Sequence, residues 1–291
     1  MYYKRTMKRV STIRELQDQI IKANLSPLGF VPTMGALHDG HISLINTASE
    51  SCPLVVVSIF VNPTQFNDKE DLKNYPRPFN KDLNLLEKVL REKDIVFTPE
   101  TREIYPEEDK RVFSFGNLDK VMEGVNRPGH FNGVGQVVSR LFDIVKPDRA
   151  YFGLKDFQQV AIIRELVRQT GCRVRIISCP IVRESDGLAM SSRNQLLEPD
   201  LRKRAGIIYQ TISEAAAMAS GSEVNPLKEF VKNRINNAEG FSVEYFEIVD
   251  DIDLIPLNSV SEVRRGLNYF GCIAVKAGKI RLIDNIEISF L

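Results

Sequence analysis

The chain has no tryptophan, few histidines and cysteines, and almost no net charge over its 291 residues. The cysteines lack the spacing of metal ligands, so free thiols are expected at Cys52, Cys172, Cys179 and Cys272. The longest apolar run, residues 54–61, is too short to cross a bilayer. The net charge of +1 gives no global attraction to a polyanion such as DNA or tRNA. We therefore expect a cytoplasmic protein with no membrane or nucleic-acid partner.

Two kinds of apolar pattern alternate along the first 180 residues. Stripes with helical spacing predict helices, and the first of them follows a capping-box pattern at Thr12–Glu15. Short runs rich in Val, Ile and Phe predict buried strands at residues 28–32, 54–61, 95–97, 150–152 and 174–177. This alternation predicts an α/β fold with a Rossmann-like, doubly wound parallel sheet. Ligands of such folds bind at the carboxyl ends of the strands.

The pattern changes after about Arg183. Two helices are expected over residues 201–219 and 224–238, followed by strands over residues 243–249, 269–275 and 280–283. This arrangement predicts a second, smaller α+β domain. We expect the domains to span residues 1–182 and 183–291.

All three histidines lie close to glycines. His38 and His41 occupy a loop between the first buried strand and a helix, in the order Gly35, His38, Gly40, His41. Backbone N–H groups at a helix N-terminus attract anions, and imidazole can donate a hydrogen bond or a proton near neutral pH. This loop therefore predicts a phosphate-binding site.

Polar residues also follow the other predicted strands, and each has a structural alternative. Gln65 could bind a substrate or satisfy loop backbone groups, and Lys155 could bind phosphate or be a solvated surface lysine. The segment Ser191–Arg193 offers hydroxyls and a guanidinium for a triphosphate, or could cap a helix. His130 could be a core imidazole bonded to a carbonyl. Zinc at His38 and His41 is disfavoured because no cysteine lies nearby.

The amino-acid sequences of these loops also resemble those of a known family. The pair His38-Asp39-Gly40-His41 and Met190-Ser191-Ser192-Arg193 resembles the HxGH and KMSKS-like loops of the nucleotidyltransferase superfamily. Within that superfamily, the following segments together resemble the pantothenate synthetase family: Val31-Pro32-Thr33-Met34-Gly35, Ser58–Phe66, Tyr75-Pro76-Arg77, Arg127–Phe131, Lys155–Gln159 and Asp186–Asn194.

This resemblance implies a reaction and a set of site residues. Pantoate and β-alanine are condensed at the expense of ATP through pantoyl adenylate, with release of pyrophosphate and AMP. The implied catalytic residues are His41, His38, Lys155 and Arg193. The implied ATP-binding residues are Met34, Gly35, His38, Gly40, His41, Gly153, Lys155, Asp156, Val182, Met190, Ser191, Ser192 and Arg193. Pantoate and β-alanine are assigned to Gln65, Gln159, Pro32, Met34 and His130.

The resemblance also implies Mg²⁺, a homodimer and a second domain that acts as a lid. Asp82 is a weak candidate for a magnesium ligand. Two other functions stay open: an adenylyl transferase with a different acceptor, and a nucleotide-sensing protein without catalysis. The absence of a Gly-x-Ser-x-Gly elbow or a Cys–His motif argues against a hydrolase.

Overall fold

The computed structural model describes residues 7–66 and 69–290, and the chain divides into two compact units. The first unit contains the chain up to Phe115, together with Asn126–Leu154 and Ile162–Pro180. The second contains Gly116–Val125, Lys155–Ala161 and Ile181–Leu291. The domain boundary between residues 182 and 183 stays a prediction.

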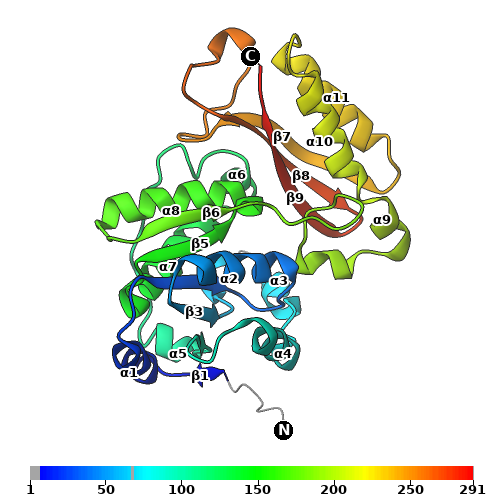
Figure 1. Cartoon of the computed structure of the whole chain (residues 1–291). Helices are drawn as coiled ribbons and strands as arrows, with labels where there is room; N and C mark the ends of the chain where they lie inside the picture. Colours follow the sequence, from blue (N-terminus) through cyan, green and yellow to red (C-terminus); the bar gives the residue numbers. More distant parts are fainter. Residues whose placement is uncertain (1–6, 67–68, 291) are drawn as a thin grey trace. The chain divides into compact units, whose positions relative to one another are not determined.

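The first unit is built on a parallel sheet of six strands, as the sequence predicted (Figure 1). The strands are β1 Lys8–Val10, β2 Leu28–Thr33, β3 Leu54–Ile59, β4 Ile95–Phe97, β5 Arg149–Gly153 and β6 Arg175–Cys179. Their order across the sheet is β1-β4-β3-β2-β5-β6. From β2 the chain runs to β3 and β4 in one direction, and β5 and β6 lie in the other. The order therefore reverses between β2 and β5, where this fold class binds ligands.

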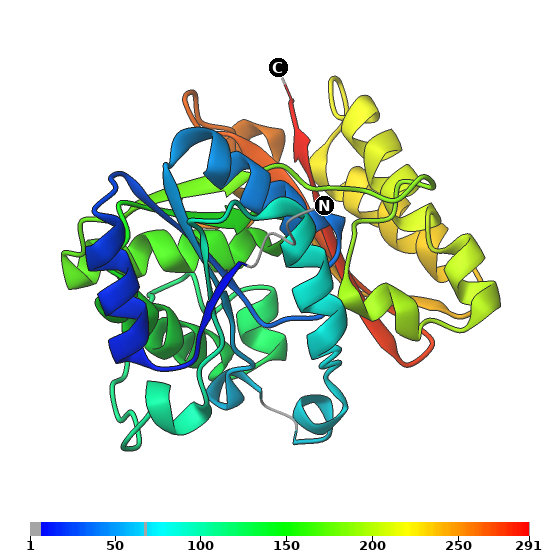
Figure 2. The ribbon, with the colours of Figure 1, turned by 60° about the horizontal axis from the view of Figure 1, so that its bottom comes forward.

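Helices cover both faces of this sheet (Figures 1 and 2). Helices α2 (Asp39–Ser51) and α4 (Phe79–Val89) cover one face, where Val31 packs with Ile45 and Leu86. On the other face Phe30 meets Phe142 of α7 (His130–Val145), which also contacts α1 (Ile13–Ala23). The remaining elements of this part of the chain are α3 Lys69–Asn74, α5 Thr101–Ile104, α6 Glu123–Asn126, α8 Phe157–Thr170 and the 3-10 helices η1 Pro63–Gln65 and η2 Leu154–Asp156.

The five predicted strands of the first unit are present, and the structure adds short elements that the sequence did not predict. Thr12 and Glu15 form the predicted capping box of α1. Strand β1 was not predicted, because three residues are too few to show a period. Helix α7 begins at His130, directly after Gly129 in a left-handed conformation (φ +80°).

The second unit contains an antiparallel sheet, with β7 (Phe241–Asp250), β8 (Tyr269–Ala277) and β9 (Ile280–Ile288) in that order. Helices α10 (Ile207–Met218) and α11 (Val224–Asn236) pack against it (Figure 1). The prediction of one helix over residues 201–219 was wrong, because α9 (Pro199–Arg204) ends before Gly206 and α10 begins after it. The 3-10 helices η3 Ser192–Leu196 and η4 Val260–Glu262 complete this unit.

Two expectations about composition can be compared with the structure. All four cysteines are free thiols, and three of them are buried, whereas Cys172 is half-buried. Within residues 7–66 and 69–290, no helix has the length and apolar character needed to cross a membrane.

Candidate functional site

The two-histidine loop lies at the carboxyl end of β2, beside the point where the strand order reverses. Gly35 adopts a left-handed conformation (φ +79°), and a Cβ atom there would lie 3.0 Å from Asp82 Oδ2 and 3.1 Å from Ile59 Cγ2. Ala36 is also left-handed (φ +50°), a conformation that costs energy for a residue with a Cβ atom. The chain therefore turns sharply between β2 and α2.

Asp82 on α4 stabilises this turn from within the protein. Its side chain is 1% exposed, and its two carboxylate oxygens accept the backbone N–H groups of Ala36 (2.9 Å) and Leu37 (2.8 Å). Burial raises the pKa of the Asp82 carboxyl, and the two N–H donors oppose this shift. These contacts give Asp82 a role in fixing the loop, and its suggested role as a metal ligand stays a prediction.

The imidazoles of His38 and His41 have a defined orientation. His38 is the N-cap of α2, and its Nδ1 accepts the N–H of Gly40 (3.2 Å). The Nδ1 of His41 accepts the N–H of His38 (3.3 Å), and the two ring centroids are 4.1 Å apart. Because Nδ1 is the acceptor in both rings, the proton of each neutral imidazole is on Nε2. The two rings therefore present Nε2–H groups as hydrogen-bond donors.

The backbone of the same loop does not offer the donors that the sequence suggested. The N–H groups of Ala36, Leu37, His38 and Gly40 are bound to side chains, and that of Gly35 donates to Thr33 Oγ1 (3.3 Å). These five N–H groups therefore have acceptors within the loop, and anion binding by the backbone of this loop stays a prediction.

Gln65 is the last residue of η1, which follows β3 after a short loop, and Asn62 fixes its amide. Asn62 Nδ2 donates to Gln65 Oε1 and to the carbonyl of Gly133, both at 3.2 Å. The orientation of Asn62 is set in turn by Tyr105, whose hydroxyl donates to Asn62 Oδ1 (3.1 Å). Gln65 Nε2 then lies 2.8 Å from Met34 Sδ, so the amide group of Gln65 meets the Met34 side chain that follows β2.

His130 is buried at the start of α7, with its Nδ1 2.8 Å from the carbonyl oxygen of Gln65. Its Nε2 lies 3.1 Å from Arg127 Nη1. This is the carbonyl-bonded imidazole that the sequence left open. His130 thus supports the backbone that carries Gln65, whatever contact it makes with a substrate.

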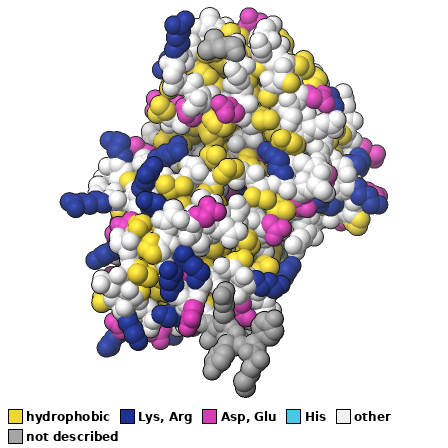
Figure 3. Space-filling view, in the orientation of Figure 1, with side chains coloured by type: hydrophobic (Ala, Val, Ile, Leu, Met, Phe, Trp, Pro, Cys, Tyr) yellow, Lys and Arg dark blue, Asp and Glu magenta, His cyan; other side chains and the backbone are white. Residues whose placement is uncertain are grey.

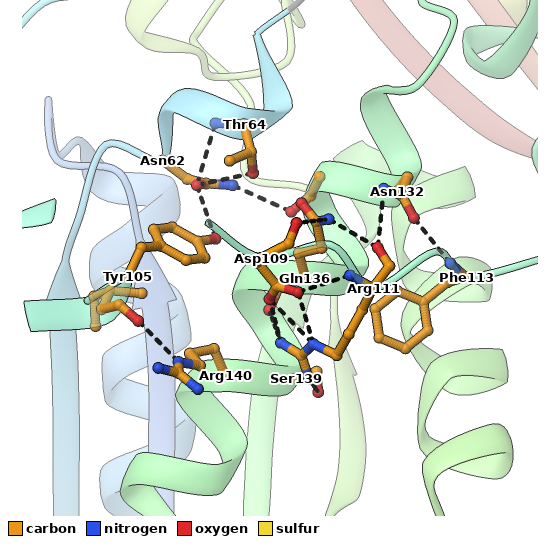
Figure 4. A network of polar contacts seen from close by, with 12 residues as sticks. Asn62, Thr64, Tyr105, Asp109, Arg111, Phe113, Asn132, Gln136, Ser139 and Arg140 are labelled. Carbon is orange, nitrogen blue, oxygen red and sulfur yellow. Dashed lines mark hydrogen bonds and ion pairs between the residues drawn. The ribbon is translucent and has the colours of Figure 1, made fainter. Parts of the chain in front are cut away.

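A second network anchors residues 109–113 to α7 (Figure 4). Arg111 binds the carboxylate of Asp109, the hydroxyl of Ser139 and the carbonyl of Gln136. The Gln136 amide donates to the carbonyls of Asp109 and Arg111 at 2.9 and 2.8 Å. The Arg111 guanidinium holds the pKa of Asp109 below its usual range.

The second unit contains Lys155, Asp156 and Gln159 of the predicted set, all half-buried. Lys155 follows two residues after β5, and its Nζ lies 3.3 Å from the Asp156 carboxylate. The backbone carbonyl of Lys155 accepts a hydrogen bond from Asn285 Nδ2 (3.2 Å). Gly153, at the end of β5, belongs to the first unit.

Residues 182–190 of the same unit form a small hairpin. Met190 N–H donates to the carbonyl of Val182 (3.0 Å), and Arg183 pairs with Ala189 as an antiparallel bridge. Ser191 then caps η3, with its hydroxyl accepting the N–H of Arg193 (3.2 Å). The capping alternative therefore holds for Ser191. The hairpin places Val182 beside Met190, and the cap fixes Ser191 relative to Arg193.

Sequence reasoning missed the residues that hold these side chains in place. Asn62 and Tyr105 orient Gln65, and Asn285 holds Lys155, but a buried amide gives no distinctive signal in one sequence. Asp82 was noticed, but for a different role. Among residues 7–66 and 69–290, no cluster of three His, Cys, Asp or Glu side chains could hold a metal ion.

Comparison with known proteins yields relatives over nearly the whole chain. The family described as pantoate-beta-alanine ligase matches residues 5–287. The pantothenate synthetase of Bacteroides thetaiotaomicron is 50% identical over 283 residues, which cover 97% of this chain and 99% of that protein. The pantothenate synthetase of Phocaeicola vulgatus is 51% identical over 284 residues, with the same coverage.

Solved structures agree with this similarity. The crystal structure of pantothenate synthetase from Thermus thermophilus matches with a TM-score of 0.87 and 41% identity, covering 97% of this chain and 99% of that one. The pantoate-beta-alanine ligase of Francisella tularensis, solved in complex with beta-gamma ATP and beta-alanine, matches with a TM-score of 0.78 and 34% identity. It covers 97% of this chain and 98% of that one.

Proposed function

Because this chain belongs to the pantoate–β-alanine ligase family, we propose that it condenses (R)-pantoate with β-alanine to form pantothenate, with ATP converted to AMP and pyrophosphate. This reaction is the last step of pantothenate biosynthesis. The observation that carries the proposal is the pair of imidazoles, with their Nε2–H groups as donors, at the carboxyl end of β2.

The reaction has two displacement steps. A carboxylate oxygen of pantoate attacks the α-phosphorus of ATP, and the bond to the leaving pyrophosphate breaks, which gives pantoyl adenylate. The amine of β-alanine then attacks the acyl carbon, AMP leaves, and the amine loses a proton. Since pantoate supplies the nucleophile of the first step, the protein needs no nucleophilic side chain. Its task is to position the reactants and to stabilise the charge that develops on the phosphates.

The proposed ATP contacts follow from the chemistry of each group. His38 and His41 donate hydrogen bonds to phosphate oxygens through Nε2–H, and Lys155 and Arg193 neutralise phosphate charge. The hydroxyls of Ser191 and Ser192 bind the same triphosphate. The other proposed ATP-binding residues are Met34, Gly35, Gly40, Gly153, Asp156, Val182 and Met190.

The proposed contacts to pantoate and β-alanine centre on two amides, Gln65 and Gln159. Asn62 holds Gln65 Oε1, so Gln65 meets its ligand with an N–H group and binds an acceptor oxygen of pantoate. Pro32, Met34 and His130 complete the proposed set.

Mg²⁺ is proposed to enter with ATP. The described residues do not form a protein cage for it, and the Asp82 oxygens already bind backbone N–H groups. Mg²⁺ commonly keeps several waters and binds through phosphate oxygens of its nucleotide. We therefore propose that the triphosphate supplies most of its ligands, and Asp82 stays the predicted protein ligand.

A homodimer in the cytoplasm, with no nucleic-acid partner and with the second domain as a lid, completes the proposal. Acidic and basic side chains share the visible face of the molecule (Figure 3), in keeping with the net charge of +1. Light scattering after gel filtration tests the proposed dimer. Filter binding with tRNA tests the proposed absence of a nucleic-acid partner.

Exchange of labelled pyrophosphate into ATP tests the proposed reaction. Exchange should require pantoate and should proceed without β-alanine, because only the first step is reversed. Mass spectrometry of the full mixture should then show pantothenate and AMP. Exchange without pantoate, or no exchange with it, would reject the proposed function.

A further inference from the structure

Strand β9 makes contact with both segments of the second unit that carry the proposed phosphate-binding residues. Asp284 and Asn285 are adjacent on this strand and are 3% and 4% exposed. Successive side chains of a strand point to opposite faces, so these neighbours serve two different segments. Asp284 contacts the segment that begins at Arg183, and Asn285 contacts Lys155.

On one face of β9, the Asp284 carboxylate binds Arg183 through two parallel hydrogen bonds, at 2.7 and 3.0 Å. Arg183 Nη1 also donates to the carbonyl of Gly187 (3.0 Å), and its guanidinium lies 3.7 Å from the ring centroid of Tyr209. Arg183 therefore ties the tip of the 182–190 hairpin to β9. Ser191 and Arg193 follow that hairpin directly.

On the opposite face, Asn285 Nδ2 donates to the backbone carbonyl of Lys155 (3.2 Å). A hydrogen bond to a backbone atom fixes where the side chain of that residue starts. The reach of the flexible Lys155 side chain then depends on this anchor.

We propose that Asp284 and Asn285 are positioning residues for ATP, which hold the hairpin before Ser191 and Arg193 and the backbone of Lys155 on one strand. This inference rests on the proposed function, because it takes Lys155 and Arg193 to bind phosphate. A shared strand gives the two cationic groups a common rigid support. A shift of either segment by about 1 Å misplaces a charge in the transition state and costs up to about 100-fold in rate.

A double-mutant cycle on pantoate-dependent pyrophosphate exchange tests the Asn285 arm. Asn285→Ala should raise the KM for ATP and lower kcat/KM about tenfold, with the KM for β-alanine in the full reaction unchanged. In the Lys155→Ala background, the same substitution should change exchange by less than about twofold, because Asn285 acts through Lys155. Equal losses in both backgrounds, or an unchanged KM for ATP, would overturn the inference.

Controls separate positioning from folding. Ile288→Val trims the core-facing side of the same strand, and should lower the melting temperature while leaving the KM for ATP unchanged. Asn285→Ser retains a hydroxyl donor. If Asn285→Ala does not fold, Asn285→Ser replaces it in the same double-mutant cycle. For the Asp284 arm, Asp284→Asn should have a smaller effect in the Arg193→Ala background than in the wild type, with the remainder acting through Ser191 and Ser192, and fully additive losses there would refute that arm.

Exchange measured with the wild-type protein distinguishes a failure of the positioning roles from a failure of the proposed function. Wild-type exchange combined with additive losses rejects the positioning roles alone. If the wild type shows no pantoate-dependent exchange, the proposed function fails, and the positioning roles fail with it.

Discussion

Replacement of Gly133 by alanine should weaken pantoate binding without a comparable effect on ATP. Gly133 lies in the first turns of α7, against η1, which carries Gln65. A Cβ atom at this position would lie 2.4 Å from the carbonyl oxygen of Thr64 and 2.8 Å from Gln65 Cα. These are backbone atoms, about 1 Å short of ordinary contact distance, so η1 must move.

The expected magnitudes follow from that displacement. Alanine gains about 1 kcal/mol of helix propensity, but overpacking against backbone costs about 1–3 kcal/mol, so we expect a net destabilisation of about 1 kcal/mol. A shift of Gln65 by about 1 Å should raise the KM for pantoate about 10- to 100-fold. Steady-state kinetics with each substrate varied in turn, together with denaturant unfolding, measure both effects.

Gly135→Ala is the matched control on the same helix. Its Cβ atom would meet ring atoms of Phe113 and Phe115 at 3.0 and 3.1 Å, and these side chains can rotate away. This variant should keep a KM for pantoate close to that of the wild type. Our assignment of Gln65 is refuted if Gly133→Ala folds and binds pantoate normally, or if it weakens ATP binding to the same degree.

The other predictions concern His41, Lys155 and two aspartates, of which Asp82 is buried and Asp109 is half-buried. His41→Ala and Lys155→Ala should each lower turnover about 10²–10⁴-fold with unchanged circular dichroism, and near-wild-type rates would reject their roles. Asp82→Ala should destabilise the protein by about 2 kcal/mol in denaturant unfolding, because two buried N–H groups lose their acceptor, and an unchanged midpoint would contradict this. Arg111 depresses the pKa of Asp109, so this pair stabilises the fold above the ordinary aspartate pKa, and the stabilisation is lost as the pH falls through the depressed value. Asp109→Asn should therefore be less stable than the wild type by about 1 kcal/mol at neutral pH, and the difference should vanish in acid; a constant difference would argue against the ion pair.

The sequence predicted the parallel sheet well, because buried strands and amphipathic helices leave clear periods. It failed where tertiary contacts decide the outcome. The break between α9 and α10 occurs at Gly206, where a Cβ atom would lie 2.6 Å from the carbonyl oxygen of Asp186. An isolated glycine in a helical pattern was the available signal, but only the neighbouring segment explains why it is needed there.

The positions of the candidate residues after the strands could be predicted from the sequence, whereas the hydrogen bonds that hold these residues could not. His38, His41 and Gln65 follow predicted strands, and parallel pairing of β2 with β3 brings the ends of those strands to one edge of the sheet. Asn62 and Tyr105 could not be assigned roles, because the hydrogen bond between them links positions 43 residues apart in the chain.

The hydrogen bonds of the two-histidine loop determine which donors the proposed phosphate site can offer. A glycine loop before a helix normally binds phosphate through its backbone, but here Asp82 occupies two of the N–H groups, and the imidazoles occupy two more. A buried carboxylate at this position would repel a triphosphate if its charge were not already compensated by those donors. The same hydrogen bonds that consume the backbone donors also fix the two imidazole tautomers. In the proposed site, the loop therefore offers Nε2–H groups in place of those four backbone donors, and an Nε2–H group can both bind a phosphate oxygen and transfer a proton.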